Sequence, residues 1–269
     1  TIYVQRLYSP IVSIGNMFVK IKNFFPLLDN IYNVMFNEKN IIKGDYKHSS
    51  ELMGNISFDN VWFGYNNERF ILKGFTETFN RGEIIGIVGN NGSGKTTLVR
   101  LLTKLCTVER GKIEIDGIDI NTFDMEYLQT QIGVMTQNSY LLAEEFNNIL
   151  KSEKELNKMK KFLEEMNFYE SGNSILKGNF EVKENNLNIS GGEAQKLALY
   201  KLYLDNKPIC VLDEPTAALD SNSEEKMIEF IKNHFKEKTV IIITHKPQIL
   251  KICNRIIKLE LYEGGKMTV

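Results

Sequence analysis

The feature that most constrains the fold is a glycine-rich stretch, G-N-N-G-S-G-K-T, which runs from Gly89 to Thr96. It follows the apolar run Glu83–Val88 and leads directly into Lys95–Leu105, a segment with helical spacing. Glycines allow successive backbone N–H groups to curl around a phosphate, and the helix N-terminus presents its positive end to the same anion. The stretch therefore predicts a strand, a phosphate-binding loop and a helix in succession.

The positions of this loop have expected roles in nucleotide binding. We expect Lys95 to reach the β- and γ-phosphates, and the Thr96 hydroxyl to bind Mg²⁺, because this hard cation prefers oxygen ligands. The other residues expected to contact the nucleotide are Gly89, Asn90, Asn91, Gly92, Ser93, Gly94 and Thr97. The alternative is a glycine-rich turn that binds nothing. The loop alone does not distinguish GTPases, kinases, recombinases and transport ATPases.

Strand-like and helix-like segments alternate along the chain, which predicts an α/β fold. At 269 residues the chain can bury one large core, with or without a smaller lobe. The β-branched runs Ile209–Leu212 and Thr239–Ile243 are typical of strands buried on both faces of a parallel sheet, and a helix is expected between them at Glu224–Phe235. Further expected segments are strands at Ile56–Tyr65, Phe70–Phe79 and Ile132–Met135, a strand pair within Lys112–Ile120, and a helical insertion at about Glu144–Asn206.

Two acidic residues, Asp213 and Glu214, follow the strand Ile209–Leu212. In a parallel α/β sheet this strand end lies beside the phosphate loop. We expect Asp213 to help hold Mg²⁺. We expect Glu214 to polarise the attacking water, because in-line hydrolysis needs a proton acceptor on the far side of the γ-phosphate. A chance acidic pair at a strand end is the alternative.

A second stretch, N-I-S-G-G-E-A-Q-K from Asn188 to Lys196, opens a segment with helical spacing. Ser190 is a good N-cap, so an ordinary capped helix would explain these residues in isolation. Their order and spacing relative to Asp213, however, resemble the signature motif and the Walker B segment of ATP-binding-cassette proteins. The resemblance covers nearly all of Asn55–Val269.

This resemblance implies a fold, a ligand and an activity. The expected architecture is a P-loop NTPase (RecA-like) core with an antiparallel β subdomain and an α-helical subdomain at about 140–205, within an ATPase domain at 51–269. Residues 1–50 are expected to form an N-terminal helical extension and a linker. The resemblance further implies that the chain binds ATP and Mg²⁺ and hydrolyses ATP.

Four more positions match family residues. Tyr65 resembles the aromatic residue that stacks on adenine, Gln137 the glutamine that contacts Mg²⁺ and water, Asp220 the acid of the D-loop, and His245 the switch histidine that contacts the γ-phosphate. Each also has an ordinary structural explanation. Tyr65 could be a buried sheet aromatic, Gln137 a surface polar residue, Asp220 a helix cap and His245 a structural histidine.

In this family the signature residues contact the nucleotide held by an opposing subunit. The resemblance therefore implies that Ser190, Gly191, Gly192 and Glu193 bind ATP across a head-to-tail dimer, which two identical chains could form. The chain departs from the usual motif by having Ile189 in place of leucine and Glu193 in place of the commonest residue, glutamine. Neither change removes a residue required for catalysis, so we expect a competent site.

Two segments favour an exporter. Glu181–Asn188 resembles the exporters' T-E-V-G-E-R-G stretch, although the expected glycine is missing at Asn186. Apolar residues at helical spacing in Ile14–Met35 resemble the end of a last transmembrane helix that leads into the ATPase. A transmembrane domain is therefore an expected partner, and the transported substrate stays open among peptides, lipids and drugs. The alternatives are an importer ATPase subunit and a non-transport member of the same superfamily.

Charge and cysteine content indicate which partners and which cellular compartment to expect. The 33 lysines and arginines nearly balance the 34 acidic residues, so no strong field gathers nucleic acid, and no nucleic-acid partner is expected. The 3 cysteines lack metal-like spacing, which suits a reducing compartment. We expect the sequence given to be soluble and to work at the cytoplasmic face of the cell membrane.

Overall fold

The computed structural model describes residues 44–47, 51–66, 69–137, 153–166 and 190–259. These residues belong to a compact unit that spans Ile42–Val269. The expected N-terminal extension, the exporter-like stretch Glu181–Asn188 and the unusual Ile189 lie outside the described residues, as does much of the expected helical subdomain. The domain boundary at 50/51 therefore stays a prediction.

One sheet is antiparallel, with the strand order β2-β1-β4-β5. Its strands are β1 at Ile56–Asn66, β2 at Arg69–Phe79, β4 at Arg110–Ile115 and β5 at Ile118–Asp119. The turn between β4 and β5 places Asp116 and Gly117 at positive φ (52° and 78°). The Asp116 carboxylate accepts hydrogen bonds from the backbone N–H groups of Met53, Gly54 and Asn55, which fixes the chain as it enters β1.

The other sheet is parallel, with the order β6-β7-β8-β3-β9. Its strands are β3 at Ile84–Gly89, β6 at Ile132–Met135, β7 at Ile209–Asp213, β8 at Thr239–Ile243 and β9 at Arg255–Leu259. Ile243 of β8 pairs with both Ile87 and Asp213, so the segments after β3, β7 and β8 start side by side. The parallel arrangement thus gathers these segments at one edge of the sheet.

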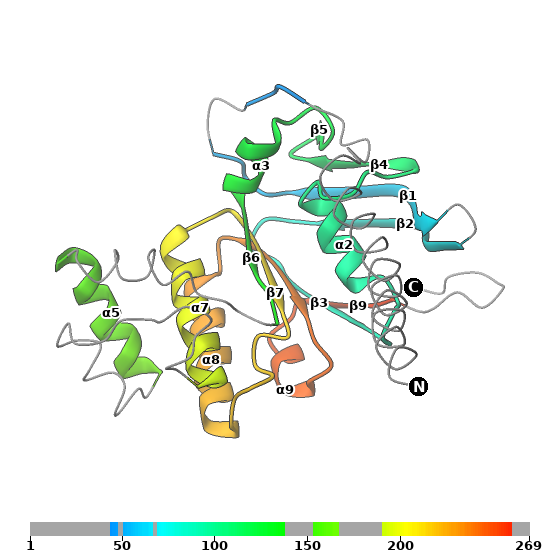
Figure 1. Cartoon of the computed structure of the whole chain (residues 1–269). Helices are drawn as coiled ribbons and strands as arrows, with labels where there is room; N and C mark the ends of the chain where they lie inside the picture. The colour runs from blue at the N-terminus through cyan, green and yellow to red at the C-terminus, as the bar shows by residue number, and fades with distance from the viewer. Residues whose placement is uncertain (1–43, 48–50, 67–68, 138–152, 167–189, 260–269) are drawn as a thin grey trace, which may run out of the picture. The chain divides into compact units, whose positions relative to one another are not determined.

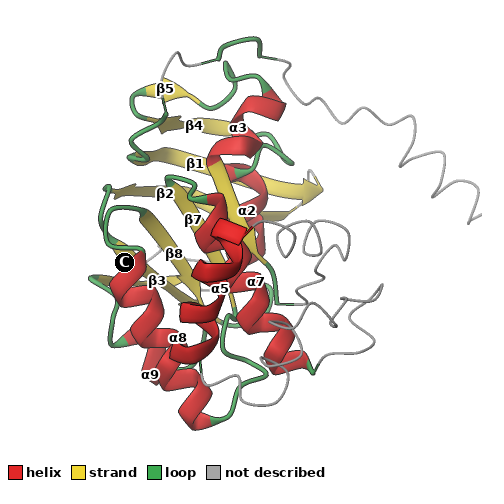
Figure 2. Ribbon diagram, turned by 90° about the vertical axis from the view of Figure 1, so that its left-hand side faces the viewer, coloured by secondary structure: helices red, strands yellow, loops and turns green. Residues whose placement is uncertain are grey.

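Helices flank the parallel sheet on both sides (Figures 1 and 2). They are α2 at Lys95–Leu102, α3 at Met125–Gln131, α5 at Glu153–Glu165, α7 at Gly191–Asp205, α8 at Ser221–His234 and α9 at Pro247–Leu250. In Figure 1, α2 lies on the side of the antiparallel sheet, whereas α7 and α8 lie on the other side of β7. No helix among the described residues is both long and apolar enough to span a membrane.

Alternate side chains of the central strands enter two different cores. Ile209 and Val211 of β7 pack into the core shared with α2 and the antiparallel sheet. Cys210 and Leu212 point the opposite way, into the core formed with α5, α7, α8 and α9. Both sets are fully buried, which explains why β7 is a continuous apolar run. Burial also raises the pKa of the Cys210 thiol to about 12.

The structure confirms the α/β fold, and β6 and β8 have the predicted bounds. Helix α2 ends at Leu102, three residues before the predicted end, because Lys104 adopts positive φ (57°) and its buried ammonium donates to the Asn121 and Phe123 carbonyls. The predicted strand Ile209–Leu212 extends to Asp213. Helix α3, helix α9 and strand β9 were not predicted.

Candidate active site

A cleft of about 930 Å³ lies at the carboxyl edge of the parallel sheet. Most of the residues predicted to bind nucleotide or metal line it, although they come from five separate segments of the sequence. The lining comprises Tyr65, Ile71, Gly89, Asn90, Asn91, Gly92, Gly94, Lys95, Thr96, Thr97, Arg100, Gln137, Asp213, Glu214, Thr244 and His245. Of these, Ile71, Arg100 and Thr244 were not singled out from the sequence.

The phosphate loop has the backbone that its glycines suggest. Gly92 and Gly94 have φ of 83° and 101°, values that residues with a Cβ rarely adopt, and Gly94 is the N-cap of α2. At Gly89 a Cβ would lie 2.3 Å from the Leu259 carbonyl oxygen, so a larger residue would displace β9. The loop is therefore a tight cradle whose open side faces the cleft.

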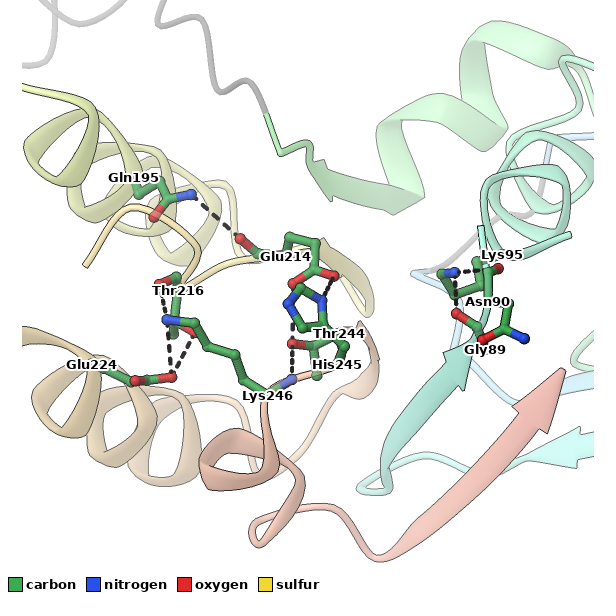
Figure 3. A network of polar contacts seen from close by, with 10 residues as sticks. All are labelled: Gly89, Asn90, Lys95, Gln195, Glu214, Thr216, Glu224, Thr244, His245 and Lys246. Atoms are coloured by element: carbon green, nitrogen blue, oxygen red, sulfur yellow. Dashed lines mark hydrogen bonds and ion pairs between the residues drawn. The ribbon is translucent and has the colours of Figure 1, made fainter. Parts of the chain in front are cut away.

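Within the cradle the Lys95 ammonium donates to the carbonyl oxygens of Gly89 and Asn90, at 2.6 and 3.0 Å (Figure 3). A phosphate in the cradle would offer this cation a charged acceptor in place of two neutral ones. Ser93 differs from the rest of the loop. It is buried, its hydroxyl has no hydrogen-bond partner among the described residues, and its N–H donates to the Asn90 carbonyl.

Asp213 ends β7 inside the cleft and is half-buried. Burial raises the pKa of its carboxyl above the ordinary value, and the neighbouring Glu214 adds to this, while Lys95 opposes it. The negative charge of Asp213 is thus only partly compensated. A cation bound here would compensate it further.

Glu214 has φ of 49°, in the left-handed region that a residue other than glycine rarely adopts. Such strain is common at functional sites. Its carboxylate accepts a hydrogen bond from the Thr244 hydroxyl at 3.2 Å and lies 2.7 Å from Nδ1 of His245. The Glu214 side chain is 13% exposed and that of His245 is 80% exposed, so the histidine is accessible to a ligand while the carboxylate is sheltered.

Tyr65 also lines the cleft and is 41% exposed, so it is not a buried sheet aromatic. Its hydroxyl accepts a hydrogen bond from Arg100 at 3.0 Å and lies 3.3 Å from the Thr97 hydroxyl. The Arg100 guanidinium also lies 5.7 Å from the centre of the ring. Arg100 was not predicted to line the cleft. The one signal in the sequence was its position one helical turn after Thr96.

Gln137 lines the cleft just after β6, and its expected contact with Mg²⁺ stays a prediction. The residues of the signature stretch, by contrast, lie outside the cleft lining. Ser190 caps α7 by accepting from the Glu193 N–H at 3.2 Å, and the Glu193 carboxylate accepts from the Ser190 N–H at 2.8 Å. Glu193, the departure from the usual glutamine, thus completes a capping box.

Gly191 and Gly192 form the first turn of α7, close to the chain near Ala218. Asp220 caps α8, and the hydrogen bonds from Ser223 hold the pKa of its carboxyl below the ordinary value. The capping alternatives for Ser190 and Asp220 are therefore real structural roles. Contacts with an opposing subunit stay a prediction for both residues.

Gln195, which links these segments, was not singled out from the sequence. Its Nε2 donates to the Glu214 carbonyl at 3.3 Å, and its Oε1 accepts from the Ala218 N–H at 3.0 Å. The available signal was a polar residue on the buried face of a largely apolar helix. Gln195 joins the serine-capped helix to the loop that follows β7.

Comparison with known proteins identifies the family of this chain. Residues 72–217 match the family model described as ABC transporter. The mitochondrial "Iron-sulfur clusters transporter ATM1" of Debaryomyces hansenii is 33% identical over 270 residues, which cover 95% of this chain and 38% of that protein. The "Alpha-hemolysin translocation ATP-binding protein HlyB" of Escherichia coli O157:H7 is 35% identical over 215 residues, or 78% of this chain and 30% of that protein.

A solved structure of a bacterial Atm1-family ABC exporter with ATP bound superposes with a TM-score of 0.73 at 27% identity. The match covers 97% of this chain and 47% of that one. The fold and the cleft define a P-loop nucleotide-binding domain. The chain belongs to the ABC transporter family, and it spans less than half the length of these relatives.

Proposed function

We propose that this chain binds ATP with Mg²⁺ and hydrolyses it as the motor domain of an ABC exporter. The observation that carries the proposal is the convergence of the phosphate loop with Asp213, Glu214 and His245 on one cleft. A cradle for phosphate, a sheltered carboxylate and an exposed histidine are suited to bind a triphosphate, to accept a proton from water and to contact the terminal phosphate during cleavage of the β–γ phosphoanhydride bond.

The cleft has room and chemistry for ATP along its whole length. The phosphates would lie in the loop, where Lys95 exchanges two carbonyl partners for phosphate oxygens and the N-terminus of α2 adds its positive dipole end. Adenine would stack on Tyr65, whose ring is held in place through its hydroxyl by Arg100 and Thr97.

The oxygen donors of the cleft fit Mg²⁺. Thr96, Gln137 and Asp213 offer a hydroxyl, an amide oxygen and a carboxylate, which are ligand types that this cation accepts together with phosphate oxygens. The described residues contain no group of three or more His, Cys, Asp or Glu side chains placed to hold a metal. The ion would therefore bind with the nucleotide, and it would neutralise charge on the phosphates.

Glu214 would accept the proton of the attacking water, because its carboxylate is sheltered and oriented by Thr244 and His245. His245, which is largely exposed, would contact the γ-phosphate. The strained backbone of Glu214 is held in place by its N–H, which donates to the Ile243 carbonyl at 2.8 Å. The base is thus positioned by two adjacent strands.

The serine-capped helix would act on a second nucleotide. Ser190 is exposed at the N-terminus of α7, outside the cleft lining of its own chain. A helix N-terminus with a serine hydroxyl that can donate a hydrogen bond and with glycine neighbours suits a γ-phosphate, so a second copy placed head to tail would complete each site. Closure of this dimer by ATP and its opening after hydrolysis would drive transport.

An exporter structure matches along 97% of this chain, and the matched part is under half of that exporter chain. This likeness favours export over import. The proposed partner is a transmembrane domain, and the proposed location is the cytoplasmic face of the membrane.

The proposal is tested by phosphate release from Mg-ATP with the purified chain. Glu214→Gln removes the proton acceptor while preserving size, so turnover should fall by about 10²-fold or more while ATP still binds. The matched control is Glu229→Gln, an exposed position on α8, which should turn over like the wild type. Undiminished turnover of the Glu214→Gln variant would refute the assigned role.

A further inference from the structure

Lys246 follows the switch histidine directly, and its side chain runs from the segment after β8 to the loop after β7. Its ammonium donates to the Thr216 carbonyl oxygen at 2.7 Å and lies 3.5 Å from the Glu224 carboxylate (Figure 3). Its own N–H donates to the Thr244 hydroxyl at 3.1 Å, and that hydroxyl in turn donates to Glu214. Lys246 is therefore linked to the segment that bears the proposed base both by its side chain and, through Thr244, by its backbone N–H.

The anchor of this lysine is itself buried. Glu224 on α8 is 8% exposed, and its carboxylate accepts from the Thr216 hydroxyl at 2.9 Å. A buried carboxylate is costly without a cation and hydrogen-bond donors. The Lys246 ammonium supplies the charge, and Thr216 supplies the second donor. The arrangement fixes the side chain of Lys246 in one direction and the carbonyl of Thr216 in one place.

The same loop is held from the opposite side by Gln195 of α7, which contacts Glu214 and Ala218. Thr216 lies between these two residues in the sequence. Two side chains thus hold the loop through hydrogen bonds. Gln195 links it to the helix that Ser190 caps, and Lys246 links it to the segment that bears His245. In Figure 3, Gln195 reaches the loop from helix α7, and Lys246 reaches it from the segment between β8 and α9.

We infer that Lys246 is a positioning residue for ATP hydrolysis. Through Thr216 and Glu224 it sets the placement of His245 relative to Glu214 and relative to the loop that leads to Asp220. The inference rests on the proposed function, but the positioning itself is a property of the fold. It assigns to Lys246 no contact with nucleotide, since this residue is not part of the cleft lining.

The test compares Lys246→Met, which keeps the length of the side chain and removes its charge and donors, with Lys246→Arg, which keeps both. Lys251→Met is the control, because Lys251 is an exposed lysine just after α9. In Lys246→Met the kcat for ATP should fall about tenfold or more while KM changes less than about twofold, since ground-state binding does not involve this residue. Lys246→Arg should keep most of the turnover, and Lys251→Met all of it.

A second variant separates positioning from stability. Lys246→Met leaves Glu224 without its cation, whereas the double variant with Glu224→Gln removes that buried charge. Thermal stability should return in the double variant and turnover should stay low, because the link to the Thr216 carbonyl is still missing. A double variant that regained turnover together with stability would overturn the inference.

Hydrogen–deuterium exchange in the same variants measures how firmly these segments are held, and it does not depend on ATP hydrolysis. Peptides covering 214–220 and 244–250 should exchange faster in Lys246→Met and at wild-type rates in Lys246→Arg. Wild-type exchange in Lys246→Met would contradict the inference even if the chain hydrolysed ATP. Absence of hydrolysis in the wild type, with the expected exchange pattern, would refute the proposed function and leave the positioning role supported.

Discussion

The carboxylate of Glu214 and the imidazole of His245 meet at 2.7 Å, at the carboxyl ends of the adjacent strands β7 and β8. Their contact depends on parallel pairing, which sets Asp213 opposite Ile243 and so starts both following segments at one level. A γ-phosphate would offer His245 a competing anionic partner. The exposed histidine can turn toward it while Thr244 continues to orient Glu214.

Replacing Tyr65 should weaken nucleotide binding without slowing the chemical step. Stacking of a base on an aromatic ring contributes about 1–3 kcal/mol, so Tyr65→Ala should lower ATP affinity about tenfold, with kcat little changed. Tyr65→Phe keeps the ring and loses the hydroxyl contacts to Arg100 and Thr97, so its effect should be smaller. Titration with a fluorescent ATP analogue measures both, and wild-type affinity in Tyr65→Ala would rule out the stacking role.

Asp213→Asn should stabilise the chain at neutral pH while abolishing Mg²⁺-dependent turnover. Because burial raises the pKa of Asp213 in the folded state, the folded chain holds its proton more tightly than the unfolded chain does. Ionisation therefore costs stability as the pH rises from the ordinary value, about 3.9, through the raised one. Neutral asparagine does not carry this cost.

Thermal melts of Asp213→Asn and the wild type, without nucleotide, should accordingly differ more at pH 7.5 than at pH 4. Asp59→Asn, on the exposed part of β1, is the control. A melting temperature of Asp213→Asn at or below that of the wild type at pH 7.5 would contradict the conclusion that ionisation of the half-buried Asp213 carboxyl lowers stability.

The sequence predicted those parts of the fold whose signal is local. Apolar β-branched runs located β7 and β8, and the glycine pattern located the phosphate loop and the start of α2. Helix α9 has only 4 residues and α3 has 7, too few to establish a helical period. Strand β9 alternates exposed and buried residues over only 5 positions, so it was missed as well.

The candidate site was predictable where motif residues themselves line the cleft. Residues that contact these motif residues from other parts of the chain have no comparable signal in the sequence. Gln195 contacts Glu214 across 19 positions and Lys246 contacts Thr216 across 30, and neither spacing is implied by a helical or strand period. Arg100 is placed beside Tyr65 only when β1 packs near α2. Such contacts depend on the tertiary arrangement.

The central claim is that each ATP lies between the phosphate loop of one chain and the Ser190 helix of another. Two variants test it. Lys95→Ala disables the cradle, and Ser190→Asp keeps an N-capping residue while placing a negative charge against the γ-phosphate of the partner. Each variant alone should have little ATPase activity, because every site in either homodimer is damaged.

ATP hydrolysis by an equal mixture of the two variants is the decisive measurement. Half of the dimers would then pair one chain of each kind, and each of these would contain one intact site out of two, so the mixture should recover about a quarter of the wild-type rate. A mixture that hydrolyses ATP no faster than the separate variants, or a Ser190→Asp chain that is fully active alone, would contradict the account.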